Sequence, residues 1–309
     1  MLLKLTINSL YARLLTVSMT VLAISLSLML YLSVEKLRSS AYTSFTNTIS
    51  QTDLIVGSRT GSVQLLLYSV FRIGNATNNI TWESYEDIIN RDEIKWSVPI
   101  SLGDSHKGFR VMGTNTDFFK RYKYRGDRSL KIEEGKYFVD LYDVVIGFGV
   151  AEKLGYNIST PLIVSHGLKS FLEHDDQPFK VSGILAKTGT PVDNTIIVSL
   201  EAIEAIHVDW SSGAKILGKA TPIDKIRKMD LSPSNITAVL LGVNSKLTIF
   251  QLQRWINEYP EEALTSILPG VALQELWRIV GVVENILLGI SLIVILTTLM
   301  GMTAIVFSS

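Results

Sequence analysis

The densest group of potential metal ligands in the sequence is the consecutive run Glu173, His174, Asp175 and Asp176. Carboxylates and imidazoles bind divalent metal ions, but adjacent side chains in a loop cannot all point at one ion, and no HExxH or paired-histidine spacing is present. We therefore predict a solvated charged turn and no metal site. The remaining histidines are isolated in the sequence, and we interpret them as surface or packing residues. They are His106, His166 and His207.

Two glycine-rich turns lack the residues that bind nucleotides. The segment 57–62 has no Gly-Lys-Ser/Thr to hold phosphate and Mg²⁺, and Gly147-x-Gly149 lacks the third glycine of a dinucleotide loop. The absence of cysteine excludes thiolate metal sites, iron–sulfur clusters and cysteine nucleophiles. Each candidate serine, histidine and aspartate falls in a different predicted element, so spacing argues for no catalytic set. We expect no cofactor and no catalytic residue.

An apolar stretch between Gly61 and Gly74 is a candidate contact surface. The helix expected over residues 62–73 would be apolar all round, which is typical either of a buried core helix or of a surface that binds lipid, a lipoprotein or a protein partner. Both alternatives stay open. The candidate contact residues are Leu65, Leu66, Leu67, Tyr68 and Phe71.

A second candidate is the turn that contains Thr190, Pro191 and Asp193. Proline fixes the backbone of such a turn, and this local role is the favoured interpretation. A place at a subunit interface is the alternative, so these three residues form a candidate interface loop.

Two long uncharged stretches predict membrane-spanning helices. Residues 14–34 contain no charge and cover about 30 Å of hydrocarbon at 1.5 Å per residue, and residues 285–307 are long enough to return. Residues 1–13 have the pattern of an amphipathic helix on the cytoplasmic face, where Lys4 and Arg13 favour a cytoplasmic N-terminus. We therefore expect the middle of the chain to lie outside the cytoplasm.

Glu284 is the only charged residue in the apolar stretch 279–307 that contains the second span. A carboxylate near the outer interface can extend towards water, and it can alternatively make a transmembrane polar contact. Both interpretations stay open.

Both helices are expected to continue beyond the membrane as stalks, over residues 35–50 and 271–284, because apolar residues recur there at helical spacing. Each span with its stalk would measure about 36 residues or about 54 Å. Since a helix is stiff along its axis, two such stalks can transmit displacement to a domain; the alternative is that they are only connectors.

The residues between the stalks alternate short strands with short helices, which predicts a two-lobed α+β extracytoplasmic domain. Residues 51–115 and 235–270 would form the first lobe, with residues 116–234 inserted as the second. A series of three small units is the alternative. A hairpin is expected to turn at residues 103–105.

The 29 basic and 29 acidic residues are balanced and form no run of one sign, so nucleic acid is not an expected partner.

Several segments together resemble the MacB/LolC/FtsX-like ABC transporter permeases with a MacB-type periplasmic core domain. They are LKLTINSLYARLLTVSMTVLAI, DLIVGSRTGS, YDVVIGFGVAEKLGYNIS, FKVSGILAKTGTPVDNTIIVSLEAI and ELWRIVGVVENILLGI. The resemblance implies an inner-membrane protein with four membrane helices, a homo- or heterodimeric permease and a separate cytoplasmic ATPase subunit. The sequence given stops at Ser309 before the third helix, so we expect a truncated or incomplete form of a longer protein.

The hypothesis that follows is a permease subunit that converts ATP-driven motion of a partner into movement of a periplasmic domain. Its substrate would be a lipoprotein, lipid, peptide or other envelope molecule, and a periplasmic or lipoprotein partner is possible. One alternative is a non-transporting FtsX-like regulator of a cell-envelope enzyme or a subunit of a zinc-related transport system. Another is a membrane-tethered sensor or binding module.

Overall fold

The computed structural model describes residues 14–46, 48–167, 178–211, 214–216 and 221–308. The chain divides into two compact units: a helical unit formed by residues up to 43 and from 275 onward, and an α+β unit over residues 44–274. The predicted amphipathic helix at residues 1–13 and the charged run at residues 173–176 lie outside the described residues.

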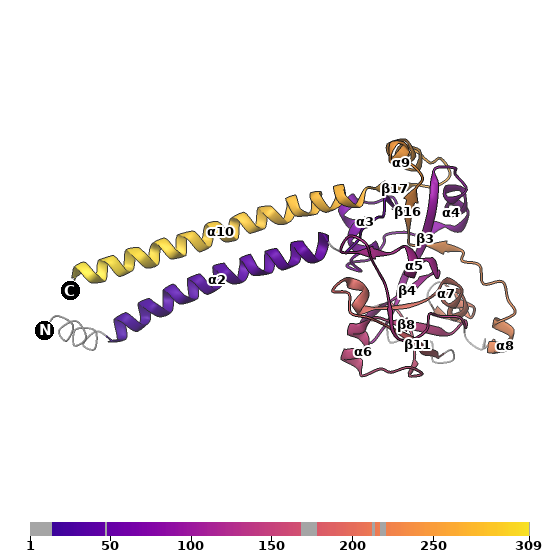
Figure 1. The fold of residues 1–309 in the computed structure, drawn as a ribbon, viewed down its shortest axis with the longest axis horizontal. Helices are drawn as coiled ribbons and strands as arrows, with labels where there is room; N and C mark the ends of the chain where they lie inside the picture. The colour runs from indigo at the N-terminus through magenta and orange to yellow at the C-terminus, as the bar shows by residue number, and fades with distance from the viewer. Residues whose placement is uncertain (1–13, 47, 168–177, 212–213, 217–220, 309) are drawn as a thin grey trace. The chain divides into compact units, whose positions relative to one another are not determined.

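The helical unit contains most of two long helices, α2 (Leu14–Thr46) and α10 (Pro269–Ser308), and the first six residues of α10 belong to the α+β unit (Figure 1). The stretch Pro269–Gly301 of α10 is long and apolar enough to cross a membrane, and 6% of its most apolar part is buried. An apolar helix with so little protein around it is typical of a helix surrounded by lipid. Among the described residues α10 alone meets this criterion, so a membrane-spanning role of α2 stays a prediction.

The α+β unit is organised by one large mixed sheet. Its strands lie in the order β17 (Leu264–Ile267), β1 (Leu54–Ser58), β16 (Ala238–Val243), β3 (Ile94–His106), β4 (Phe109–Thr114), β12 (Thr195–Ser199), β8 (Asp143–Ile146), β11 (Phe179–Leu185) and β7 (Ile132–Gly135). Two further strands join at the side: β10 (Ser165–His166) pairs with β3, and β9 (Pro161–Leu162) pairs with β11. The β4–β12 and β8–β11 pairs are parallel, and the others are antiparallel.

The strand order separates the sheet into two halves that meet where β4 pairs with β12. The first half, from β17 to β4, uses strands from residues 54–114 and 238–267. The second half, from β12 to β7, uses strands from residues 132–199. These ranges fall within the two predicted lobes, but the sheet runs through both without interruption. The division into separate lobes stays a prediction.

Short helices and small strands complete the α+β unit. The helices are α3 (Ser62–Ser69), α4 (Trp82–Ile89), α5 (Asp117–Arg121), α6 (Phe148–Leu154), α7 (Leu200–His207), α8 (Ile223–Ile226) and α9 (Ile249–Asn257), with 3-10 turns at Pro191–Asn194 and Lys246–Thr248. The small strands are β2 (Ile80–Thr81), β5 (Lys123–Tyr124), β6 (Arg128–Ser129), β13 (Trp210–Ser211), β14 (Ala214–Lys215) and β15 (Asn235–Ile236). Thr81 caps the N-terminus of α4, since its side chain accepts a hydrogen bond from the Ser84 amide.

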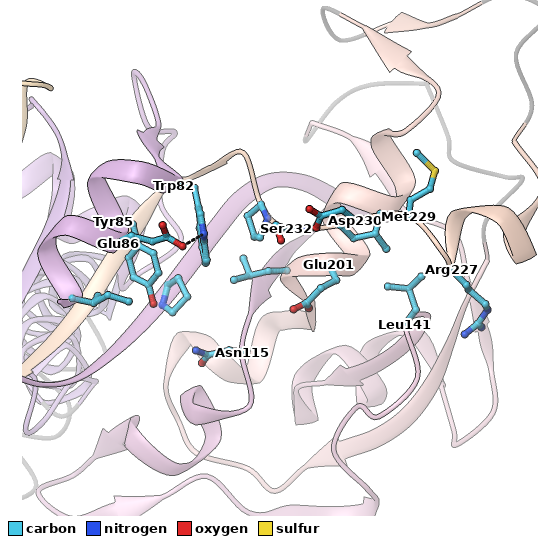
Figure 2. A pocket seen from close by; sticks show the side chains of 15 residues that line it. Trp82, Tyr85, Glu86, Asn115, Leu141, Glu201, Arg227, Met229, Asp230 and Ser232 are labelled. Carbon is cyan, nitrogen blue, oxygen red and sulfur yellow. Dashed lines mark hydrogen bonds between the residues drawn. The ribbon is translucent and has the colours of Figure 1, made fainter.

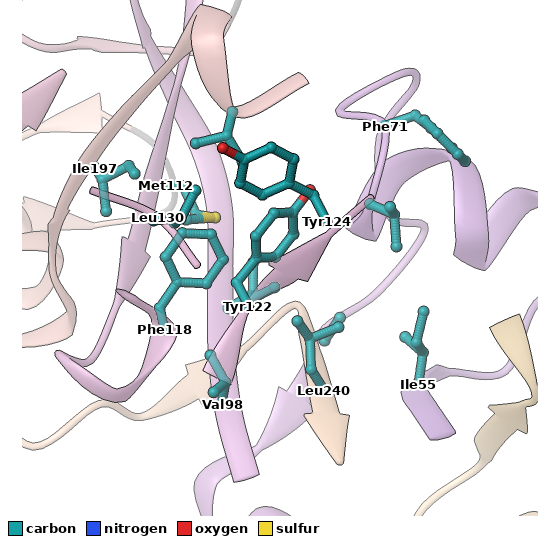
Figure 3. Close-up of a cluster of buried hydrophobic side chains, with 14 of the residues drawn as sticks. Ile55, Phe71, Val98, Met112, Phe118, Tyr122, Tyr124, Leu130, Ile197 and Leu240 are labelled. Carbon is teal, nitrogen blue, oxygen red and sulfur yellow. The ribbon is translucent and has the colours of Figure 1, made fainter. Parts of the chain in front are cut away.

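Alternation along the strands gives the sheet three apolar clusters. On one face Ile55 of β1 and Ile197 of β12 belong to a single cluster that extends across both halves, and Figure 3 shows part of it. On the other face the neighbouring residues belong to two clusters, one containing Leu54 and the other containing Ile196. The shared cluster therefore joins the two halves through packing as well as through strand pairing.

The expected hairpin turn at residues 103–105 is wrong. Strand β3 continues to His106, and the turn lies at Lys107 and Gly108, whose φ angles of 47° and 83° suit a two-residue hairpin turn. An irregularity in the β3–β4 pairing between Leu102 and Ser105 accommodates the residues that had indicated a turn. As a result Asp104 lies within the sheet, opposite His166 of β10.

The turn between β8 and α6 depends on close packing around Gly147. A Cβ atom at this position would overlap the backbone carbonyl oxygens of Val192 and Asp193, which cannot rotate away as a side chain could. We expect Gly147→Ala to lower the free energy of unfolding by about 1–3 kcal/mol, measured by denaturant unfolding of the full chain in detergent.

Gly61 provides a matched control. Both glycines cap the N-terminus of a helix with nearly the same backbone angles, φ −69° and ψ 155° at Gly147 against φ −68° and ψ 147° at Gly61. No atom lies within 4 Å of a Cβ built on Gly61. Gly61→Ala is therefore expected to cost less than about 1 kcal/mol. Equal losses in the two variants would contradict the packing argument.

Candidate functional site

The apolar stretch that was a candidate contact surface forms α3, and most of it is buried. Leu65 and Leu66 are fully buried, Tyr68 is 2% exposed and Phe71 is 7% exposed, whereas Leu67 is half-buried. Burial also raises the pKa of Tyr68 to about 12. These positions favour the core alternative. A contact role for the stretch stays a prediction, and Leu67 is its most accessible member.

The candidate interface loop is held together by the buried carboxylate of Asp193. Its Oδ1 accepts hydrogen bonds from the backbone amide and the hydroxyl of Thr188, at 2.8 and 2.7 Å, and its Oδ2 accepts one from the Gly189 amide at 2.8 Å. Thr190 is buried and Pro191 is half-buried, at the start of the 3-10 turn. Hydrogen bonds between residues of the loop itself therefore hold its conformation. Its role at a subunit interface stays a prediction.

Glu284 lies on α10 in the helical unit and is half-buried there. Its role as a transmembrane polar contact stays a prediction.

A pocket of about 670 Å³ opens on the α+β unit beside α4 (Figure 2). Apolar residues of its wall include Trp82 and Leu200, and its charged residues include Glu86 and Arg227. Trp82 donates a hydrogen bond from Nε1 to the Glu86 carboxylate at 2.9 Å. No histidine is among the described residues that line this pocket, so they offer no imidazole for proton transfer near neutral pH.

A different set of polar side chains converges beside β3. Asp104 of β3, His166 of β10 and His207 at the end of α7 place their ligand atoms within 4.8 Å of one another. His166 is brought there by the pairing of β10 with β3, in which His166 lies opposite Asp104. A hydrogen bond of 2.5 Å from the Ser105 hydroxyl to the Gly167 carbonyl holds the same two segments together.

The three side chains are in direct contact. Nδ1 of His166 lies 3.3 Å from Oδ1 of Asp104, and Nε2 of His207 lies 3.8 Å from the same oxygen. The two imidazole nitrogens are 3.2 Å apart. The nearby Asp104 carboxylate raises the pKa of His166, although partial burial of the imidazole opposes this effect.

Exposure differs sharply within this Asp104–His166–His207 cluster. The Asp104 side chain is 4% exposed, whereas the side chains of His166 and His207 are 39% and 27% exposed. The indole of Trp210 stacks on His166 with the ring centres 5.9 Å apart. Trp210 is positioned by its neighbour Asp209, whose carboxylate accepts hydrogen bonds from the amide and hydroxyl of Thr221. The cluster therefore has a buried carboxylate, and its two imidazoles are partly accessible to solvent.

The sequence did not indicate this cluster. His166 and His207 were interpreted as isolated surface or packing residues, and Asp104 was assigned to a turn. The three residues are separated by 62 and 41 positions, and no motif relates them. Only the pairing of β10 with β3 and the position of α7 bring them together. His106, by contrast, is buried, with its ring nitrogens 2.5 Å from the Ile163 carbonyl and 2.8 Å from the Tyr156 hydroxyl.

Comparison with known proteins identifies the family. Residues 14–230 match the family model described as MacB-like periplasmic core domain, which is more than half of the chain. A comparison with curated proteins gives no match.

Among solved structures, the periplasmic region of MacB from Actinobacillus actinomycetemcomitans is similar with a TM-score of 0.44 and 11% identity, over 74% of this chain and 94% of that one. The extracellular domain of the noncanonic ABC-type transporter YknZ from Gram-positive bacteria is similar with a TM-score of 0.41 and 16% identity, over 70% and 99%. The assignment rests on the family model: this chain belongs to the family of the MacB-like periplasmic core domain, a domain of MacB/FtsX-like ABC transporter permeases.

Proposed function

We propose that this chain is a permease subunit in which ATP hydrolysis by a separate cytoplasmic subunit drives movement of the α+β unit. The movement would act on a lipoprotein, lipid, peptide or other envelope substrate on the far side of a bacterial inner membrane. The supporting observation is that the α+β unit, most of which lies within the match to this family, continues directly into α10, a helix long and apolar enough to cross a membrane. The chain itself would supply no catalytic group.

The topology of the proposal uses α2 as the outward span and α10 as the returning one. At 1.5 Å per residue, the 33 residues of α2 extend about 50 Å and the 40 residues of α10 about 60 Å. A hydrocarbon core of about 30 Å accounts for only part of either length. The remainder would form the stalks that lead to the α+β unit.

The start of α10 is fixed to the core of the α+β unit, which supports mechanical coupling. One residue, Leu268, separates β17 from α10, so no flexible linker intervenes. Ala272 in the first turn is 2% exposed and belongs to the apolar cluster shared by both halves of the sheet. Leu273 packs against the same cluster. Axial movement of α10 would therefore displace the sheet itself.

The chain that follows α2 is fixed in a similar way. The Tyr122 hydroxyl donates a hydrogen bond to the backbone carbonyl of Thr48 at 2.5 Å, and the Ser50 amide donates one to the carbonyl of Lys123 at 2.9 Å. Burial raises the pKa of Tyr122 to about 12, so the phenol keeps its proton at physiological pH. Both connections between the long helices and the domain would then transmit force.

The expected partners follow from the same proposal. A cytoplasmic ATPase and a second permease subunit, identical or different, would complete the transporter, and a periplasmic or lipoprotein partner could bind the domain. The full-length protein, solubilised from its native membrane, should be recovered with an ATPase subunit. Recovery of an intact dimer without any ATPase would contradict the transporter proposal and favour a membrane-tethered sensor.

The topology can be tested with single cysteines, because the chain contains none. Leu247 is 92% exposed on the α+β unit, and Met300 is 70% exposed on α10. We expect Leu247→Cys to react with a membrane-impermeant maleimide added to intact spheroplasts. Met300→Cys should stay unreactive even in broken cells, because its thiol lies in hydrocarbon.

Since both side chains are accessible in the protein, the membrane alone accounts for the expected difference between these two variants. Reaction of Leu247→Cys only after the cells are broken would place the α+β unit in the cytoplasm and overturn the proposed topology.

A further inference from the structure

We propose that Asp104, His166 and His207 form a binding site for one divalent transition-metal ion of the Zn²⁺ class. Two imidazole nitrogens and one carboxylate oxygen are a donor set typical of such ions, whose preferred ligands are nitrogen and sulfur together with carboxylate oxygen. The proposal does not depend on transport, since it concerns only the α+β unit.

The distances between the ligand atoms match a tetrahedral ion. Metal–ligand distances of about 2.0–2.1 Å at tetrahedral angles place neighbouring ligand atoms about 3.3–3.4 Å apart. The three observed separations are 3.2, 3.3 and 3.8 Å. A small movement of His207 towards Asp104 would bring the third separation close to this edge as well. The cluster is therefore close to the geometry that metal binding requires.

The buried carboxylate provides an independent indication. Oδ1 of Asp104 is buried and makes no well-aligned hydrogen bond among the described residues; its close polar neighbours are the two imidazole nitrogens, at 3.3 and 3.8 Å. A buried carboxylate oxygen without a hydrogen bond is energetically costly unless a cation compensates it. A metal ion between this oxygen and the imidazoles would supply that charge.

The orientation of His207 also suits a ligand. Its Nδ1 lies 2.7 Å from the backbone carbonyl of Ile203, so Nδ1 carries the proton and donates it to that oxygen. In the neutral imidazole Nε2 then carries the lone pair, and this atom is the one that faces Asp104 and His166. Hydrogen bonding of the second imidazole nitrogen to a carbonyl is the usual way in which proteins fix a metal-binding histidine.

The site would connect the two halves of the sheet. Asp104 lies on β3 of the first half, whereas His207 follows β12 of the second half through α7. Ligation of both would add a cross-link between segments that strand pairing has already brought together. Because the ion would bind the folded unit and not the unfolded chain, it should also raise the stability of the α+β unit.

The test uses the full chain purified in detergent without a histidine tag. After treatment with a chelator, Zn²⁺ is titrated in competition with a chromophoric chelator, and Co²⁺ is added as a spectroscopic probe. We expect one Zn²⁺ per chain, intense visible absorption typical of tetrahedral Co²⁺, and a rise of several degrees in the unfolding temperature with Zn²⁺.

The variants Asp104→Asn, His166→Gln and His207→Gln should each weaken Zn²⁺ binding by about 100-fold or more. His106→Gln is the matched control, because both nitrogens of this imidazole already face other partners, and it should bind Zn²⁺ as the unaltered chain does. Unfolding temperatures measured with chelator present show whether each variant is folded.

Two results would overturn the metal site: absence of tetrahedral Co²⁺ absorption in the unaltered chain, or undiminished Zn²⁺ affinity in folded variants of the three ligands. Either result would leave the proposed transport function untouched, because recovery of the ATPase subunit is a separate measurement.

Discussion

The parallel pairing of β4 with β12 is the contact on which the rest of the α+β unit depends. Five residue pairs, from Arg110 opposite Thr195 to Thr114 opposite Ser199, join segments more than 80 positions apart in the chain. This pairing makes two groups of strands into one sheet, and the apolar cluster on one face extends across the junction. It also sets where α7, which follows β12, and its last residue His207 lie.

The position of α7 is a direct consequence of that pairing. The helix begins at Leu200, immediately after β12, and it crosses β4 where Gly113 has no side chain. A Cβ atom at Gly113 would come within 2.6 Å of Ile203 Cγ1, so the glycine allows the helix to pack closely. The last residue of α7 is His207, and this packing places its imidazole beside Asp104. The same geometry thus serves both the stability of the sheet and the proposed metal site.

Much of the secondary structure could be predicted from local sequence pattern. The β-branched run of β12 is a local signal of a strand and Thr81 is a local signal of a helix start, and the structure has a strand and a helix at these positions. The hairpin turn was misplaced because glycine and aspartate are common in turns, whereas Gly103 and Asp104 lie in an irregular part of a strand. Local propensity was overridden there by pairing with β10.

The candidate site could not be predicted in the same way. An apolar stretch such as 65–68 has the same pattern in a core as on a surface, and only the packing of α3 on β1 beside Gly57 distinguishes the two. The Asp104–His166–His207 cluster has no sequence signal, because its members come together only through strand pairing and the position of α7.

The central claim is that nucleotide state in a partner moves the α+β unit relative to the membrane. The most direct measurement is the distance from a spin label on Leu247→Cys to spin-labelled lipid headgroups, recorded by pulsed electron paramagnetic resonance in nanodiscs containing the complete transporter. The account predicts different distance distributions for the nucleotide-free and ATP-bound complexes. Identical distributions, in a complex whose ATPase is shown to bind ATP, would contradict it.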